Sequence, residues 1–287
     1  SDSLVVLGAG TMGSGVASVA LQKGIAVRLR DISVESLKKG LAYIGKQIHQ
    51  RFRKKRMSRE QRDETLSRLT YGKELHGLAT AGCVLEAVVE RMDVKQSVLA
   101  DLSSRLPDKA IFATNTSALS VTLIQEGSPV ADRVVGLHFF NPVPLMPLVE
   151  VIPGEQTSPE TVGKALALAR KLGKYPVIAK DSPGFLVNRV LTPYLLAASR
   201  LLLNGVPGAH IDEVARRHGL PMGPFRLMDE VGLDVGVEVQ QTLHSAFGHR
   251  YQASPLLRDV FPRGWLGNPN KWNSHRYLQG WRQVLGA

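Results

Sequence analysis

His138 and Glu150 are titratable residues inside apolar, strand-like runs of the stretch GLHFFNPVPLMPLVEVI, residues 136–152. Burying either group costs solvation free energy unless another group pairs with it. An imidazole can take a proton from a hydroxyl and return it near neutral pH. A carboxylate on the second ring nitrogen would orient the ring and stabilise the imidazolium. The stretch therefore predicts an acid–base pair with His138 as the base, whereas a lone histidine in an apolar strand is more often structural.

A second group of candidate residues lies near the amino terminus. Gly8, Gly10 and Gly13 have the spacing G-x-G-x-x-G between a short apolar run and a helical pattern, and Asp31 ends the next alternating run. In a dinucleotide-binding turn the first glycine permits a tight turn, the second lets backbone approach a pyrophosphate, and the third lets helix pack on strand. The helix N-terminus then attracts the phosphates. The pattern predicts NAD, because Asp31 can bind both ribose hydroxyls and repel a 2′-phosphate, although the arginines beside it leave NADP open.

Two further polar residues could hydrogen-bond a substrate oxygen. Ser117 follows the strand candidate AIFAT, at the edge where an open parallel sheet gathers its ligand groups. Asn188 lies in the apolar helical run FLVNRVLTPYLLAASRLLLNG. Each residue alone is more often a cap or turn residue, because short polar side chains bond readily to nearby backbone.

The elements that must position these residues change in kind along the chain. Strand and helix patterns alternate to about residue 180, and beyond DSPG the chain is helical. A parallel strand pair with a helical crossover needs helices on the sheet faces. The sequence therefore predicts an α/β Rossmann-type doubly wound sheet domain over residues 1–180, followed by an all-α domain over residues 181–287. The further strand candidates are GCVLEAV, AIFAT, RVVGLHFF, LVEVI and YPVIA.

The composition limits the classes of partner. The 287 residues carry a formal charge of +11, and the run KQIHQRFRKKRMSREQR, residues 46–62, holds eight Lys or Arg against one Glu. This run is either a solvated helix face or a site for a phosphate-bearing small ligand. Nucleic acid is not expected, because Phe52 is the only interleaved aromatic or glycine in the run and the run belongs to no recognisable module. No apolar run reaches the roughly 20 residues that cross a bilayer. The single cysteine, Cys83, suits a reducing compartment and excludes a thiolate metal cluster.

Six stretches, at matching order and spacing, resemble the L-3-hydroxyacyl-CoA dehydrogenase family. The resemblance covers residues 3 to about 266 and is strongest to the dehydrogenase part of the multifunctional fatty-acid β-oxidation α subunit. The final twenty residues do not match. The stretches are LGAGTMGSGVA, LEAVVE, TNTSAL, GLHFFNPVPLMPLVEVI, DSPGFLVNRVLTPYL and GLPMGPFRLMDEVGLD.

This resemblance implies NAD-dependent oxidation of an L-3-hydroxyacyl-CoA to the 3-ketoacyl-CoA. It implies His138 as the base with Glu150 as its partner, Ser117 and Asn188 as contacts to the reacting oxygen, and Asn141 as a neighbouring amide. Coenzyme A has a 3′-phosphate and a pyrophosphate, so Lys54 and Arg56 are expected to bind it. No metal is expected. The expected cofactor-binding residues are Gly8, Gly10, Thr11, Met12, Gly13, Asp31, Glu90, Lys95 and Asn115.

Several properties stay open at this level. The alternatives are a dinucleotide-binding protein of the same fold without activity and a related dehydrogenase acting on a hydroxy acid without CoA. Multifunctional members carry a hydratase region before these residues and a second helical repeat after them. The chain is therefore expected either to act beside further domains of a longer protein or to pair with a second copy. Acyl-chain length stays open, as does the compartment: cytoplasmic in a bacterium, mitochondrial or peroxisomal in a eukaryote.

Overall fold

The computed structural model describes residues 3–231 and 233–252 of the chain. The chain divides into two compact units, residues 1–182 and residues 183–287, where the sequence predicts a boundary at residue 180. Each unit is described by itself. The predicted mismatch in the final twenty residues lies outside the described residues.

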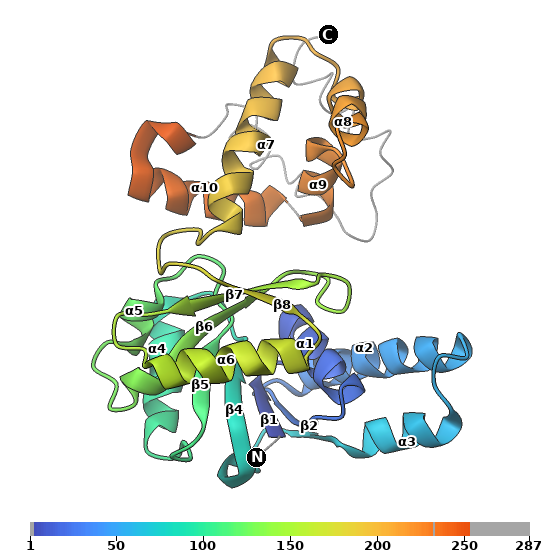
Figure 1. Ribbon diagram of the computed structural model, residues 1–287, viewed down its shortest axis with the longest axis vertical. Coiled ribbons are helices and arrows are strands. Elements are labelled where there is room, and N and C mark those ends of the chain that lie inside the picture. Colours follow the sequence, from blue (N-terminus) through green and yellow to red (C-terminus); the bar gives the residue numbers. More distant parts are fainter. Residues whose placement is uncertain (1–2, 232, 253–287) are drawn as a thin grey trace. The chain divides into compact units, whose positions relative to one another are not determined.

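The first unit is built on one sheet of eight strands in the order β3-β2-β1-β4-β5-β6-β7-β8 (Figure 1). The strands are β1 (Ser3–Leu7), β2 (Ala26–Arg30), β3 (Leu69–Gly72), β4 (Ala81–Glu86), β5 (Ile111–Thr114), β6 (Val134–Phe139), β7 (Leu148–Pro153) and β8 (Tyr175–Ile178). The helices are α1 (Thr11–Gln22), α2 (Val34–Arg53), α3 (Arg59–Ser67), α4 (Met92–Ser103), α5 (Val121–Gln125) and α6 (Pro159–Lys171), with short 3-10 turns η1 (Leu78–Thr80) and η2 (Ala131–Arg133).

Strand direction changes once across the sheet. Strands β3 to β6 are parallel, β7 is antiparallel to β6, and β8 is parallel to β7. Antiparallel neighbours can be joined by a short connection without a crossover helix, and residues 140–147 form such a connection. The sequence suggested an open parallel sheet, and this is wrong for β7 and β8, because apolar runs do not record strand direction.

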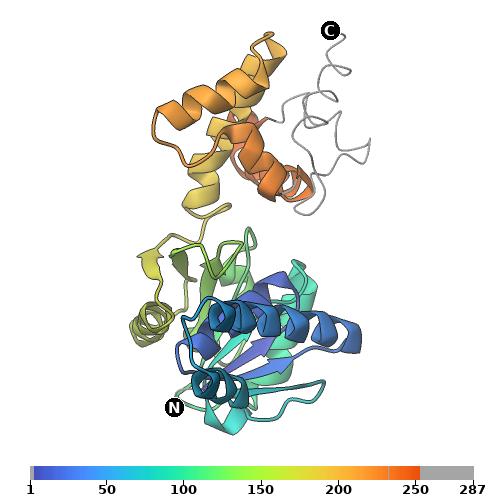
Figure 2. The same cartoon turned by 90° about the vertical axis from the view of Figure 1, so that its right-hand side faces the viewer.

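Alternate residues of the strands bury opposite faces of the sheet. On one face, Leu4, Val6 and Val135 join a core with side chains of α1, α2 and α6. Helices α4 and α5 contact one another, and α5 contacts β6 and β7. The sheet is therefore a layer between helices, as the predicted fold class requires, and Figure 2 shows the same unit from the side.

The basic segment is two helices rather than one. Helix α2 ends at Arg53, Lys55 has a positive φ of 52°, and Ser58 begins α3 through a capping box with Gln61. The Arg62 guanidinium lies 5.0 Å from the centre of the Phe52 ring, which packs the end of α2 against α3. The segment that follows forms β3, an edge strand that the sequence did not predict, because its residues are half-buried or exposed.

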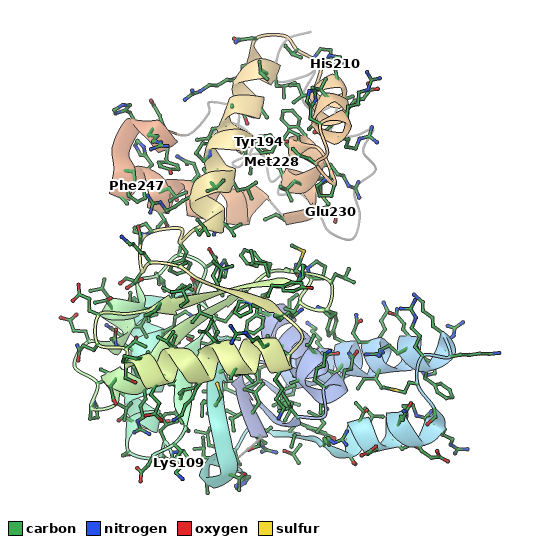
Figure 3. The ribbon with its side chains drawn as sticks, in the orientation of Figure 1. Lys109, Tyr194, His210, Met228, Glu230 and Phe247 are labelled. Carbon is green, nitrogen blue, oxygen red and sulfur yellow. The ribbon has the colours of Figure 1, made fainter. Side chains whose placement is uncertain are left out.

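The second unit is helical in its described part. Its elements are α7 (Val187–Leu203), α8 (Gly208–Arg217), α9 (Pro224–Val231), α10 (Leu233–Phe247) and the 3-10 turn η3 (Gly248–Tyr251). Figure 3 shows Tyr194 of α7 and Met228 of α9 between these two helices, which contact one another. Helix α9 was not predicted. Its first backbone N–H groups, of Phe225 and Arg226, donate to the Asp212 carboxylate on α8.

None of the helices in the described ranges is long and apolar enough to cross a membrane.

Candidate functional site

His138 and Glu150 form a buried pair on neighbouring strands. They are direct partners in the antiparallel register of β6 and β7, so their side chains share one face of the sheet. The Nδ1 atom of His138 lies 2.7 Å from Oε2 of Glu150, and both residues are buried. The ring of Phe140 lies 4.5 Å from the imidazole, centre to centre. The structure therefore brings together the two residues that the sequence singled out first.

The end of β5 is tied to the end of β6 by Asn115. The Phe139 N–H donates to Oδ1 of Asn115 at 3.0 Å, and the Asn115 N–H donates to the Glu86 carbonyl at 2.8 Å. Because β5 and β6 are parallel neighbours, Ser117 and His138 both lie toward the carboxyl edge of the strands. The sequence analysis predicted that residues binding a ligand would lie at this edge of the sheet.

The glycine turn between β1 and α1 has the packing that its spacing predicts. Gly8 has a φ of 100°, and a Cβ there would lie 2.4 Å from the Ala87 carbonyl oxygen. A Cβ on Gly13 would lie 1.9 Å from the Gly8 carbonyl oxygen, so α1 can approach the turn only with glycine there. Gly10 is the N-cap of α1 and makes no side-chain cap, which suits an anionic group at the helix N-terminus. Thr11 and Met12 form the first turn of α1.

Asp31 follows β2 and faces the glycine turn. Its carboxylate accepts hydrogen bonds from the Ala9 N–H at 2.7 Å and from the Ser33 N–H at 2.8 Å. The neighbouring arginines point elsewhere, because Arg28 and Arg30 donate to the carbonyls of Glu74 and Lys73 after β3. Asp31 is therefore fixed beside the turn, and both arginines are held by backbone oxygens.

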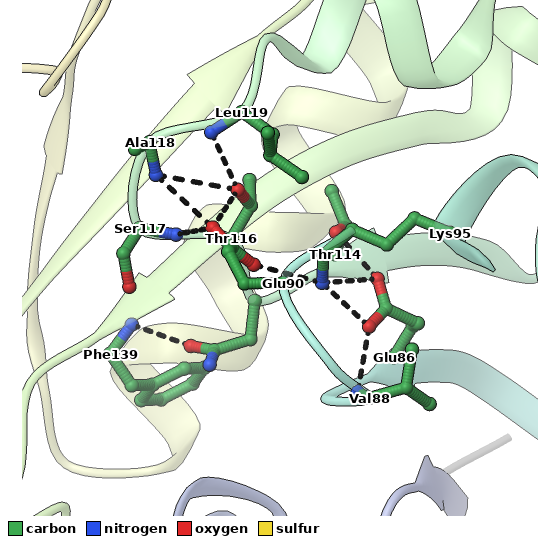
Figure 4. Close-up of polar contacts among 11 residues, drawn as sticks. Glu86, Val88, Glu90, Lys95, Thr114, Thr116, Ser117, Ala118, Leu119 and Phe139 are labelled. Atoms are coloured by element: carbon green, nitrogen blue, oxygen red, sulfur yellow. Dashed lines mark hydrogen bonds and ion pairs between the residues drawn. The ribbon is translucent and has the colours of Figure 1, made fainter. Parts of the chain in front are cut away.

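Glu90 and Lys95 belong to a polar network that includes residues the sequence did not single out. Lys95 is fully buried, and its ammonium pairs with Glu86 at 2.8 Å and with Glu90 at 3.3 Å. Glu90 accepts hydrogen bonds from the loop that carries Ser117 (Figure 4). The stretch LEAVVERMDVK holds Glu86, Glu90 and Lys95, but it does not show that Lys95 is buried and that its ammonium therefore needs a partner.

Asn141 lies in the connection between β6 and β7, is exposed, and precedes a cis peptide bond to Pro142. Lys174, which the sequence did not single out, is buried immediately before β8 and donates to the carbonyls of Val143 and Met146 in this connection. Burial lowers the pKa of Lys174, and the nearby Lys23 ammonium lowers it further. Lys174 therefore fixes the connection that holds Asn141.

The remaining predicted residues are Lys54, Arg56 and Asn188. Lys54 follows the last residue of α2 and Arg56 lies in the turn before α3, and both are exposed. The sequence offered a solvated helix face as one interpretation of the basic run. That interpretation is wrong for Lys54 and Arg56, because both lie between α2 and α3. Asn188 is on the first turn of α7 in the helical unit.

The first unit has the features that a dinucleotide requires. Gly8 and Gly13 exclude a Cβ, α1 has no side-chain cap, and a carboxylate follows the second strand. In a bound dinucleotide Gly10 would face the pyrophosphate and Asp31 a ribose, while Gly8 allows the tight turn and Gly13 the close packing of α1. Among the described residues, no group of three or more His, Cys, Asp or Glu side chains could hold a metal ion.

Comparisons with known protein families cover both units. Residues 3–182 match the family model described as "3-hydroxyacyl-CoA dehydrogenase, NAD binding domain". Residues 184–277 match the model described as "3-hydroxyacyl-CoA dehydrogenase, C-terminal domain". These matches confirm the predicted fold class and NAD as the cofactor. The second match continues past residue 266, where the sequence resemblance was expected to stop, so that limit was wrong.

Individual relatives are similar over most of the chain. The fatty acid oxidation complex subunit alpha of Shewanella amazonensis is 41% identical over 250 residues, 87% of this chain and 35% of the relative. The crystal structure of (S)-3-hydroxybutyryl-CoA dehydrogenase PaaH1 from Ralstonia eutropha has 35% identity and a TM-score of 0.88, covering 93% of this chain and 95% of that one. That of 3-hydroxybutyryl-CoA dehydrogenase from Escherichia coli K12 has 38% identity and a TM-score of 0.88, covering 93% and 57%. The chain thus spans about a third of the Shewanella subunit.

Proposed function

Because the chain belongs to the 3-hydroxyacyl-CoA dehydrogenase family, we propose that it oxidises an L-3-hydroxyacyl-CoA to the 3-ketoacyl-CoA and catalyses the reverse reduction. The observation that carries this proposal is the buried pair of His138 and Glu150 at 2.7 Å. Bound NAD supplies the hydride acceptor for this reaction. The chain's own residues orient the reactants and move the proton.

His138 is the proposed base. With Nδ1 held by the Glu150 carboxylate, Nε2 is the ring nitrogen that takes the proton of the 3-hydroxyl and returns it in the reverse direction. The carboxylate stabilises the imidazolium that forms, because the pair is buried and an ion pair is stronger where water is excluded. Positioned proton transfer of this kind contributes about 10²- to 10⁴-fold to the rate.

Ser117 is the proposed contact to the oxygen that changes charge, and Asn141 is a second polar group in the connection after β6. Asn188 is the helical unit's candidate for a contact to the same substrate oxygen. Glu90 and Lys95 are proposed to lie near the nicotinamide half of NAD. These roles come from the family resemblance. The loop contacts of Glu90 support the role of Ser117, because they hold its backbone in place.

The rival functions are a binding protein without activity and a dehydrogenase for a hydroxy acid without CoA. Oxidation of NADH by the purified chain with acetoacetyl-CoA separates the proposal from the first, and the same assay with free acetoacetate separates it from the second. We expect turnover with the CoA ester alone. Absence of turnover with both compounds would contradict the proposed function.

The role of His138 is tested in the same assay with His138→Gln. Turnover should fall by about 10²- to 10⁴-fold, because proton transfer is lost, while the affinity for NADH stays near that of the unchanged chain. His76→Gln is the matched control, since His76 is exposed in the same unit. Equal turnover in His138→Gln would remove the proposed base.

A further inference from the structure

A buried lysine lies between two glutamates at the carboxyl edge of the sheet (Figure 4). The Lys95 ammonium is 2.8 Å and 3.0 Å from the two carboxylate oxygens of Glu86, and 3.3 Å from Oε2 of Glu90. The side chains of Lys95 and Glu86 are fully buried, and that of Glu90 is partly exposed. The family resemblance gives roles to Lys95 and Glu90 but none to Glu86.

Every contact of the Glu86 carboxylate is consistent with an ionised group. Its Oε1 atom accepts from the Val88 N–H at 2.8 Å, and its Oε2 atom accepts from the Thr114 hydroxyl at 2.7 Å. Backbone N–H and ammonium groups only donate, so Oε1 receives two donors and must act as an acceptor. Glu86 therefore joins β4, the start of α4 and the end of β5 through one charged group.

Besides its contact with Lys95 through Oε2, the Glu90 carboxylate contacts the loop after β5 through its other oxygen. Its Oε1 atom accepts from the Thr116 hydroxyl at 2.6 Å, from the Ser117 N–H at 2.7 Å and from the Ala118 N–H at 3.2 Å. The Thr116 hydroxyl oxygen in turn accepts from the Leu119 N–H at 2.9 Å. One carboxylate oxygen thus fixes the backbone that carries Ser117.

We propose that Glu86 is a positioning residue that acts on Ser117 through Lys95 and Glu90. A buried ammonium must be paired with an opposite charge. Lys95 lies closer to Glu86, at 2.8 Å, than to Glu90, at 3.3 Å, so Glu86 keeps the ammonium from approaching Glu90 more closely. If Glu86 loses its charge, Lys95 pairs more closely with Glu90 and competes with the loop for that carboxylate. The loop then loosens and Ser117 moves. This inference rests on the proposed function for its effect on catalysis, but the effect on the loop is independent of catalysis.

The first experiment uses Glu86→Gln. Glutamine has the same shape: its carbonyl can keep the Val88 contact and its amide can donate to Thr114, so the fold should be retained. We expect kcat for acetoacetyl-CoA reduction to fall about 10-fold, less than the roughly 100-fold that a 1 Å misplacement costs, with the KM for NADH near that of the unchanged chain. Glu160→Gln is the matched control, because it removes an exposed ion pair, with Lys164, outside this network.

Amide hydrogen exchange separates the inference from the proposed function. Exchange over residues 116–119 should be faster in Glu86→Gln than in the unchanged chain or in Glu160→Gln, because the Ser117 and Ala118 amides donate to Glu90. Absence of turnover in the unchanged chain would contradict the proposed function and leave this measurement intact. Unchanged exchange at residues 116–119 in folded Glu86→Gln would overturn the inference, whether or not the chain is active.

A double-mutant cycle tests whether Glu86 acts through Lys95. Lys95→Met should lower kcat, and adding Glu86→Gln to it should lower kcat no further, because the partner is already gone. An additive loss would show that Glu86 acts by another route and would overturn the inference. If Lys95→Met does not fold, the amide hydrogen exchange of residues 116–119 in Glu86→Gln decides whether the inference holds. A role in stability alone would lower the melting temperature of Glu86→Gln without changing kcat per folded molecule.

Discussion

His138 and Glu150 are paired by strand register. The antiparallel alignment of β6 and β7 makes them direct partners, and their distance along the chain matters only because it allows the connection to turn back. The same pair in a parallel arrangement would need a crossover helix between its strands. The buried pair that we propose as the acid–base pair is thus a consequence of one strand reversal in the sheet.

The role of Asp31 leads to a prediction for a single residue. Asp31→Ala should weaken the binding of NAD by about 10- to 100-fold, the loss expected for hydrogen bonds to a charged group. It should also reduce the difference between the affinities for NAD and NADP. Dissociation constants for both cofactors, measured by fluorescence titration, check it. Asp31→Asn is the control that keeps one acceptor for the Ala9 N–H but lacks the charge. An unchanged NAD to NADP ratio in both variants would assign the choice to other residues.

At the scale of elements, the sequence predicted the core strands and the glycine turn because buried runs and forced glycines leave local patterns. Gly8 and Gly13 are examples, since a Cβ at either position would meet backbone. The missed elements depend on distant partners. Strand β3 has little buried surface of its own, and α9 is capped by Asp212 from α8.

Two residues of the site were also not predicted from the sequence, because they too depend on distant partners. Glu86 and Lys174 are polar residues whose partners come from other elements, and the sequence shows no spacing that joins them. The residues with a local motif, such as Asp31 after the glycine turn, could be predicted from sequence. Polar contacts between elements become visible only when the strand order is known.

Lys174 gives the prediction at this scale, because its side chain joins the start of β8 to the connection between β6 and β7. Lys174→Met leaves the carbonyls of Val143 and Met146 without this donor and should lower the free energy of unfolding by about 1–3 kcal/mol. Urea denaturation at pH 7 measures the change. Lys109→Met, at an exposed position, is the control and should stay within about 0.5 kcal/mol of the unchanged chain.

The pH dependence of the same variant has a definite sign. The folded pKa of Lys174 is below 10.5, its value in the absence of burial, so between the two values the unfolded chain binds more protons than the folded chain. The contribution of Lys174 to stability therefore rises with pH across that interval. Lys174→Met should lack this rise. The same slope in both proteins would mean that other groups produce it.

For the whole molecule, the charge of +11 is unevenly distributed along the chain. The segment of residues 46–62 carries much of the excess positive charge, and its middle is the exposed turn between α2 and α3. Opposite charges attract over about 10 Å at 0.1 M salt, so a basic turn can raise the local concentration of an anionic ligand without a tightly built pocket. Coenzyme A, with its phosphates, is the anionic ligand that the proposed function supplies.

Charge reversal of this turn tests that proposal. Lys54→Glu with Arg56→Glu should raise the KM for acetoacetyl-CoA by about 3- to 10-fold at low salt, because each exposed ion pair is worth about 0.2–1 kcal/mol. The effect should shrink as salt is added, and kcat should stay near that of the unchanged chain. Arg105→Glu with Lys109→Glu is the control, with the same change of charge at exposed positions between α4 and β5. An unchanged KM would mean that the basic turn is a solvated surface without a role in binding. An equal rise in KM in the control pair would mean that the net charge of the protein, and not this turn, acts on the substrate.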